Sequence, residues 1–167
     1  MENGHRNIGI IVGPQEIFTA QERLKGYYAA HEKRGIPVQE SLIYHGDYII
    51  QGGVKGLEEL VKKNPQMTAV FVTNYEMTMG AVIGINELGI HMPKELSMIG
   101  FDNLQFARAC SPKLTIVSQP TEAIGEKVAQ MILSRLGVGE ETEEKTVTLK
   151  LQTEIIMGKS VRNLNKM

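Results

Sequence analysis

Cysteine, tryptophan and long hydrophobic runs are scarce or absent in this chain. Its single cysteine, Cys110, excludes an intrachain disulfide framework and fits a reducing compartment. No apolar run approaches the roughly 20 residues that a transmembrane helix needs, and residues 1–6 lack the apolar core of a signal peptide. We therefore expect a soluble, cytoplasmic protein.

An excess of positive charge is also missing. The 18 lysine and arginine residues are balanced by 19 acidic residues, so the formal net charge is −1. Proteins that hold nucleic acid usually carry a clustered basic surface, so these 167 residues are poor candidates for direct DNA binding. The length is sufficient for one domain or for one lobe of a larger protein.

The common catalytic and metal-binding motifs are absent as well. The sequence has no G-x-S-x-G elbow, no phosphate-binding GxxxxGK[ST] loop and no GxGxxG after its first apolar run. The histidines at 5, 31, 45 and 91 are scattered, without metal-ligand spacing. We expect His31 and Cys110 to be packed structural side chains. The sequence predicts neither an enzyme nor a bound metal or cofactor.

Short apolar runs alternate with helical stripes along the chain. We expect strands at residues 8–12, 42–44, 68–73, 96–101 and 114–117, and a final strand at 146–156. Helices are expected at 17–34, 77–88, 105–110 and 120–136, with one more whose stripe runs over 54–61. Four successive strand–helix units predict an α/β fold, a parallel sheet with helices on both faces. Gly80 and Gly84, one turn apart, suggest a helix packed closely on that sheet.

Polar and aromatic residues follow four of the expected strands. The segments are Gly13-Pro14-Gln15, His45-Gly46-Asp47-Tyr48, Thr73-Asn74-Tyr75 and Asp102-Asn103. Because parallel strands end at the same edge of a sheet, these segments can line one binding site. Carboxylates and amides bind hydroxyl groups, and aromatic rings cover apolar sugar or base faces. The pattern favours a hydroxylated or heterocyclic ligand, although such residues are also typical of any loop.

Two candidate residues have alternative roles. Asp102 can contact a ligand or cap the helix that follows it. Arg23, in the first turns of its helix, can reach a ligand as a forked donor or lie solvated on the helix surface. The pattern of residues alone leaves both alternatives open.

Several motifs in order along the chain resemble the lactose-repressor/galactose-repressor (LacI/GalR) family of bacterial transcription regulators. They are GHRNIG (4–9), GP (13–14), RLKGY (23–27), GDY (46–48), TAVF (68–71), MTMGA (77–81), PKELSMIGFDN (93–103), PKLT (112–115) and QP (119–120). The sequence departs from the family at Tyr75, where an aspartate is usual, and at Gly158-Lys159-Ser160, where Arg-x-Ser is usual.

The resemblance implies one lobe of a periplasmic-binding-protein-like type I fold. It divides the chain into a second lobe of an effector-binding domain (1–118), a crossover segment that packs on the first lobe in the family (119–143), a closing strand (144–160) and a loose tail (161–167). The family's DNA-binding head and first lobe have no counterpart in these residues. Without a first lobe, we expect the helix at 121–136 to fold back, to pack on another copy or to be disordered.

The same resemblance implies the binding residues and partners. The effector would be a small sugar-like or nucleoside-like metabolite, and its implied contacts are Phe18, Thr19, Arg23, Tyr48, Asn74 and Asp102. A homodimer is expected, with DNA bound only through the head, and no membrane contact. The alternatives are a sugar-binding protein of the transport class and a small α/β enzyme acting on a sugar or phosphate substrate.

Overall fold

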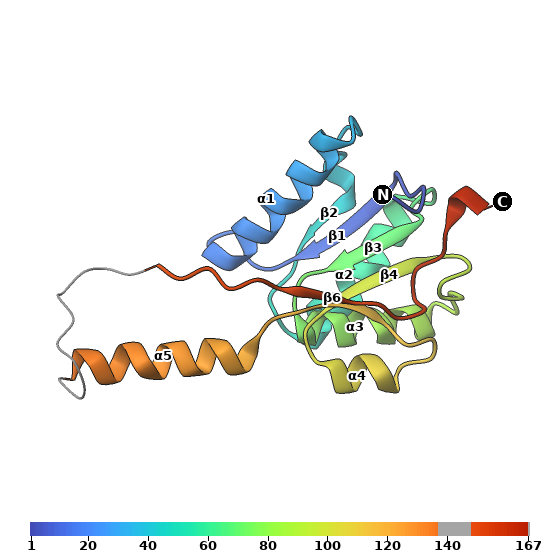
Figure 1. The fold of residues 1–167 in the computed structure, drawn as a ribbon. Coiled ribbons are helices and arrows are strands. Elements are labelled where there is room, and N and C mark those ends of the chain that lie inside the picture. Colours follow the sequence, from blue (N-terminus) through green and yellow to red (C-terminus); the bar gives the residue numbers. More distant parts are fainter. Residues whose placement is uncertain (137–147, 167) are drawn as a thin grey trace.

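The computed structural model describes residues 1–136 and 148–166, which form one six-stranded sheet in the order β2-β1-β3-β4-β5-β6 (Figure 1). The first five strands pair in parallel, and the last is antiparallel to its neighbour. The strands are β1 (Ile8–Val12), β2 (Ile43–His45), β3 (Ala69–Val72), β4 (Ser97–Phe101), β5 (Thr115–Ser118) and β6 (Glu154–Ile156).

Helices connect successive strands, and all but the last of them pack around the sheet. They are α1 (Phe18–Lys33), α2 (Ile50–Lys63), α3 (Tyr75–Glu87), α4 (Leu104–Ala109) and α5 (Thr121–Arg135), with short 3-10 turns η1 (Glu40–Leu42) and η2 (Leu164–Lys166). Helix α1 lies on one face, and α2 and α3 lie on the other (Figure 1). This arrangement confirms the predicted α/β fold class.

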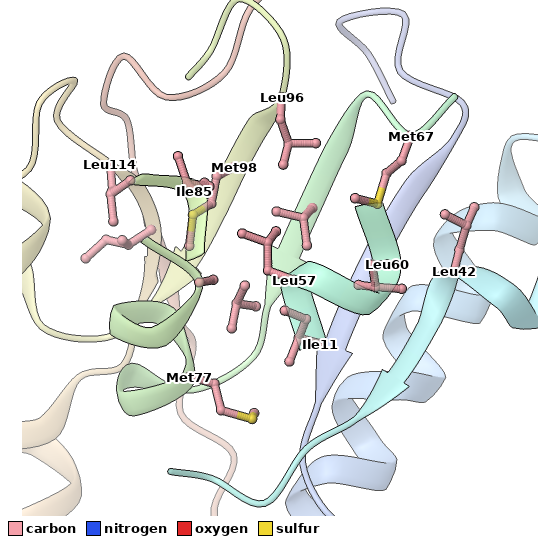
Figure 2. Packing of buried hydrophobic residues seen from close by; sticks show 14 of the residues in the cluster. Ile11, Leu42, Leu57, Leu60, Met67, Met77, Ile85, Leu96, Met98 and Leu114 are labelled. Atoms are coloured by element: carbon pink, nitrogen blue, oxygen red, sulfur yellow. The ribbon is translucent and has the colours of Figure 1, made fainter. Parts of the chain in front are cut away.

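The alternation of side chains along the strands builds two apolar clusters. Ile10 and Val12 of β1 pack with Ala20 and Tyr27 of α1 on one face. Ile11 points to the other face, into a larger cluster with side chains of α2, α3, β3, β4 and β5 (Figure 2). Because the central strands are buried on both faces, their sequences are apolar at successive positions. The predicted packing of His31 is confirmed, since it is 1% exposed and its ring lies 4.4 Å from that of Tyr27.

The glycines of α3 contact a helix, which corrects the prediction that they pack on the sheet. A Cβ atom at Gly80 would lie 2.9 Å from the Cα of Gly53 in α2, and one at Gly84 would lie 3.1 Å from the Leu57 side chain. The periodic spacing of small residues indicated a close contact, but the neighbouring element is set by tertiary packing.

The carboxy-terminal part of the chain differs from the prediction in two respects. The final strand covers only Glu154–Ile156, because β5 offers a short edge; residues 148–153 form no regular element, and 146–147 lie outside the described residues. The segment after residue 160 is not loose over its described part. The backbone N–H of Arg162 donates to Ser97 Oγ at 3.1 Å, and that of Leu164 donates to the Asn3 carbonyl at 2.8 Å.

Helix α5 is well formed but projects away from the sheet (Figure 1). None of its residues is buried, and Val128 and Ile132 are 50% and 54% exposed. Its apolar side chains Ile124, Val128 and Met131 line a groove of about 270 Å³ with Leu149 and Leu151 of the returning chain. The structure therefore shows neither the folded-back nor the disordered form, and packing on another copy stays a prediction.

Candidate functional site

The carboxyl ends of β1 to β4 lie at one edge of the sheet. Parallel pairing aligns Val12 with His45, Ile11 with Val72, and Phe71 with Ile99. The segments that follow these strands are therefore neighbours, as predicted. This edge carries the candidate binding residues.

Arg23 reaches from α1 across the ends of two strands. Its Nη1 donates to the carbonyl of Thr73, after β3, at 2.5 Å, and its guanidinium carbon lies 4.1 Å from the ring centroid of Phe101 in β4. A guanidinium over an aromatic face contributes about 0.5–2 kcal/mol, more as water is removed. Arg23 is therefore a half-buried side chain held in place, which overturns the solvated alternative. The remaining N–H groups have no hydrogen-bond partner within the part of the chain that the structure describes.

Tyr48 follows β2, and its side chain contacts Gly13, after β1, and Thr19 of α1. Its ring packs on Gly13, where a Cβ atom would come within 2.5 Å of the tyrosine oxygen, so only glycine leaves room for it. The Tyr48 hydroxyl lies 3.4 Å from Thr19 Oγ1, at the edge of hydrogen-bonding range. The aromatic ring and the threonine thus form one continuous polar-and-aromatic surface.

Asn74 holds Tyr48 and α3 together. Its Oδ1 accepts from the Met77 backbone N–H at 3.0 Å and caps α3, and its Nδ2 donates to the Tyr48 carbonyl at 3.3 Å. The unusual Tyr75 therefore does not remove the helix cap. Its ring instead packs edge-on against Phe106, with centroids 5.9 Å apart. The Asn74 amide has one N–H left for a further partner.

Asp102 does not cap the helix after it, so the capping alternative is wrong. The cap of α4 is its neighbour Asn103, whose Oδ1 accepts from the Phe106 backbone N–H at 2.9 Å. The Asp102 carboxylate instead accepts two hydrogen bonds from Gln119, from the backbone N–H at 3.3 Å and from Nε2 at 2.7 Å. Sequence reasoning missed Gln119, although it follows β5 at the same edge and the strand-end rule applies to it equally.

Phe18, the first residue of α1, is 70% exposed. Its neighbour Ile17 is 40% exposed, so the start of α1 presents an apolar surface beside Thr19. The structure thus joins Thr19, Tyr48 and Asn74 by hydrogen bonds. Arg23 lies over the ring of Phe101, the residue before Asp102, and the Phe18 side chain is exposed.

Backbone strain concentrates at this edge. Among the described residues, the non-glycine residues with positive φ are Tyr48 at 68°, Asp102 at 58° and Asn103 at 49°. Such conformations cost of order 1–3 kcal/mol each and cluster at ligand-binding sites. Tyr48 and Asp102, which follow β2 and β4, are two of these residues, which is consistent with a binding role.

The other ionisable groups do not form a competing centre. In residues 1–136 and 148–166 no group of three or more His, Cys, Asp or Glu side chains is placed to hold a metal ion. Cys110 is half-buried, and burial raises the pKa of its thiol, as expected for a structural cysteine. Within the same ranges no helix is both long and apolar enough to cross a bilayer.

Residues 1–161 match the family of periplasmic binding protein-like domains. The HTH-type transcriptional repressor PurR of Proteus mirabilis (strain HI4320) is 36% identical over 161 residues, which is 96% of this chain and 46% of that protein. The PurR of Actinobacillus pleuropneumoniae serotype 3 (strain JL03) is 32% identical over 99% of this chain and 49% of its own length. The chain therefore spans about half the length of these relatives.

A solved structure of the transcriptional regulator CelR in complex with cellobiose has the same fold. It is 33% identical and superposes with a TM-score of 0.88 over 95% of this chain and 48% of its own. These relatives are transcription regulators, so the alternative of a transport-class sugar-binding protein is not favoured. The enzyme alternative likewise finds no support among them.

Proposed function

Since this chain belongs to the periplasmic binding protein-like domain family, in the form found in LacI/GalR transcription regulators, we propose that it is one lobe of a regulator's effector-binding domain. The effector is a small sugar-like or nucleoside-like metabolite bound at the carboxyl edge of the sheet. Cellobiose in the CelR complex supports a sugar-like ligand, and a nucleoside-like ligand is the alternative.

The position of Arg23 over the ring of Phe101, the residue before Asp102, is the observation that carries this proposal. The Arg23 guanidinium is held by Thr73 and Phe101 and keeps N–H groups for a ligand. Asp102, the residue after Phe101, supplies a carboxylate that can accept. A ring with neighbouring hydroxyls needs both donors and acceptors. The rings of Tyr48 and Phe18 supply apolar faces on which such a ring packs. Thr19 and Asn74 complete the proposed contacts.

The chain path supports the proposed division into a lobe (1–118), a crossover (119–143) and a closing strand (144–160). The chain leaves the sheet after Ser118 and returns beside it, since Ser118 pairs with Glu154. Between these points α5 exposes an apolar side. Burying four such side chains on a first lobe would stabilise the pair by roughly 1.5–3 kcal/mol each.

The remaining assignments concern the whole regulator. DNA binding belongs to a head domain outside these 167 residues, in keeping with their net charge of −1 and with the HTH-type repressors among the relatives. The regulator is a cytoplasmic homodimer without enzymatic activity, cofactor or membrane contact.

Nuclear magnetic resonance titration of the 167-residue chain tests the effector site. A panel of mono- and disaccharides, nucleosides and purine bases is added at millimolar concentration, because a single lobe supplies only part of a pocket wall and affinity will be weak. A binder should shift the backbone amides of Thr19, Tyr48, Thr73 and Asp102 before any others.

Variants make the titration specific. Asp102→Ala and Arg23→Gln should abolish the shifts, and the exposed Arg108→Gln on α4 should leave them unchanged. Shifts confined to another surface, or unaffected by Asp102→Ala, would refute the site. Micromolar affinity of the isolated chain would show instead that one lobe is sufficient.

A further inference from the structure

The Asp102 carboxylate is hydrogen-bonded to Gln119, the first residue of the proposed crossover segment (119–143). Gln119 donates to both of its oxygens, at 3.3 Å from the backbone N–H to Oδ1 and at 2.7 Å from Nε2 to Oδ2. The 2.7 Å contact has the short length typical of a charge-assisted hydrogen bond. The Asp102 backbone N–H donates to the Val117 carbonyl at 2.8 Å, so the same residue is fixed on both sides by the end of β5.

Gln119 also lies directly before the start of α5. It lies between the end of β5 at Ser118 and the start of α5 at Thr121, and its carbonyl accepts from the Thr121 backbone N–H at 2.9 Å. Pro120 follows directly as the N-cap residue, and its ring restricts φ. Gln119 is therefore separated from α5 by a single residue of restricted φ.

No side chain of α5 is buried, and its apolar side chains line a groove with Leu149 and Leu151 of the returning segment. A carboxylate offers about four lone-pair positions. Gln119 occupies two of these positions, and the other two stay available to ligand hydroxyls.

We propose that Gln119 is a positioning residue that fixes the Asp102 carboxylate for a ligand and holds the start of α5 close to it. We call this contact between Gln119 and Asp102 the tether. The inference rests on the effector site proposed above. A ligand bound to Asp102 then acts on α5 through this pair, so occupancy of the site and direction of the crossover are coupled.

Distances between spin labels measure the tether without any ligand. Labels on Glu126→Cys in α5 and Glu58→Cys in α2, in a Cys110→Ser background, report the direction of α5 by double electron–electron resonance. Gln119→Leu removes the side-chain donor and should broaden the distance distribution. Gln105→Leu, an exposed glutamine of α4, is the matched control and should leave it unchanged.

An exchange of the two groups separates this contact from a general loss of structure. Gln119→Glu places two carboxylates face to face and should also broaden the distribution. Combining it with Asp102→Asn restores an amide–carboxylate pair and should narrow the distribution again. Far-ultraviolet circular dichroism checks that each variant is folded, and a variant that is not folded is replaced by Gln119→Asn, whose shorter side chain loses the reach.

The outcomes for the tether and for the effector site are distinguishable. A wild-type distribution in both Gln119→Leu and Gln119→Glu, or failure of the double exchange to narrow it, overturns the positioning role. If a panel compound binds, Gln119→Leu should weaken it by about tenfold, the loss expected for one charge-assisted hydrogen bond. If none binds while the label distances change as expected, the proposed effector fails and the tether stands.

Discussion

Replacing Gly80 with alanine tests the close contact between α2 and α3. A Cβ atom at Gly80 of α3 would lie 2.9 Å from the Cα of Gly53 and 2.9 Å from the backbone nitrogen of Val54, and would also meet the Ile50 carbonyl. The contact is reciprocal, because a Cβ at Gly53 would lie 2.7 Å from the Met77 Cα. All of these neighbours are backbone atoms, which cannot rotate away as a side chain can.

The magnitude follows from two opposing effects. Alanine favours a helix over glycine by about 1 kcal/mol. Overpacking a core costs about 1–3 kcal/mol or more, and the upper end applies because α2 and α3 must move apart above the buried Leu57 and Ala81. The net expectation is a free energy of unfolding lowered by about 2 kcal/mol, a large part of the roughly 5–15 kcal/mol typical of a domain.

Urea unfolding followed by circular dichroism measures this difference. Gly26→Ala in α1 is the matched control, because a Cβ at Gly26 meets nothing within 4 Å. It should raise the free energy of unfolding by about 0.5–1 kcal/mol. If Gly80→Ala is as stable as Gly26→Ala, the helices are not held at this separation and the reasoning fails.

Three further predictions concern His5, the α3 cap and α5. Burial lowers the pKa of His5, whose ring nitrogens contact Thr68 Oγ1 and the Arg162 carbonyl, so the unfolded state binds the proton first and stability should fall as pH drops below about 6.5; His5→Gln should flatten this pH dependence, and an unchanged slope would assign it to other groups. Asn74→Ala should cost about 1–2 kcal/mol through the lost cap, whereas Asn74→Asp, which keeps the acceptor for Met77, should cost less in the same denaturant titration. Val128→Ser with Ile132→Ser should change the stability of the isolated chain by about 0.5 kcal/mol or less, because both side chains are half exposed, and a larger loss would mean that α5 is packed in solution.

Local pattern predicted most elements of the fold. Apolar runs predicted the strands at 8–12 and 68–73, because a strand buried on both faces must be apolar throughout. Apolar stripes predicted α1 and α3 in the same way. The strand expected at 146–156 was too long, since alternation in the sequence does not show how much of a neighbouring strand remains free to pair. The tail after residue 160 looked polar and loose, but Arg162 and Leu164 find partners at Ser97 and Asn3. Partners so distant in the chain leave no mark in local sequence.

The sequence predicted where the candidate site lies, but not which contacts its side chains make. Strand ends in order along the chain predicted that Tyr48, Asn74 and Asp102 share one edge, and the parallel register aligns those ends. Only the tertiary structure decided that Asp102 does not cap α4, because Asn103 beside it is an equally good cap; its contact with a ligand stays a prediction. Gln119 was missed, since its role depends on a partner 17 positions away.

Composition and periodicity by themselves determined an α/β sheet and its helices, while the family entered only as a resemblance carried by the order of motifs. Those properties depend on local residue preferences, which each segment carries within itself. Only the tertiary structure decided that α3 packs on α2, that Arg23 rests on Phe101, and that α5 has no buried side chain. Such contacts join residues far apart in the chain, and their energies exist only once the backbone has brought those residues together.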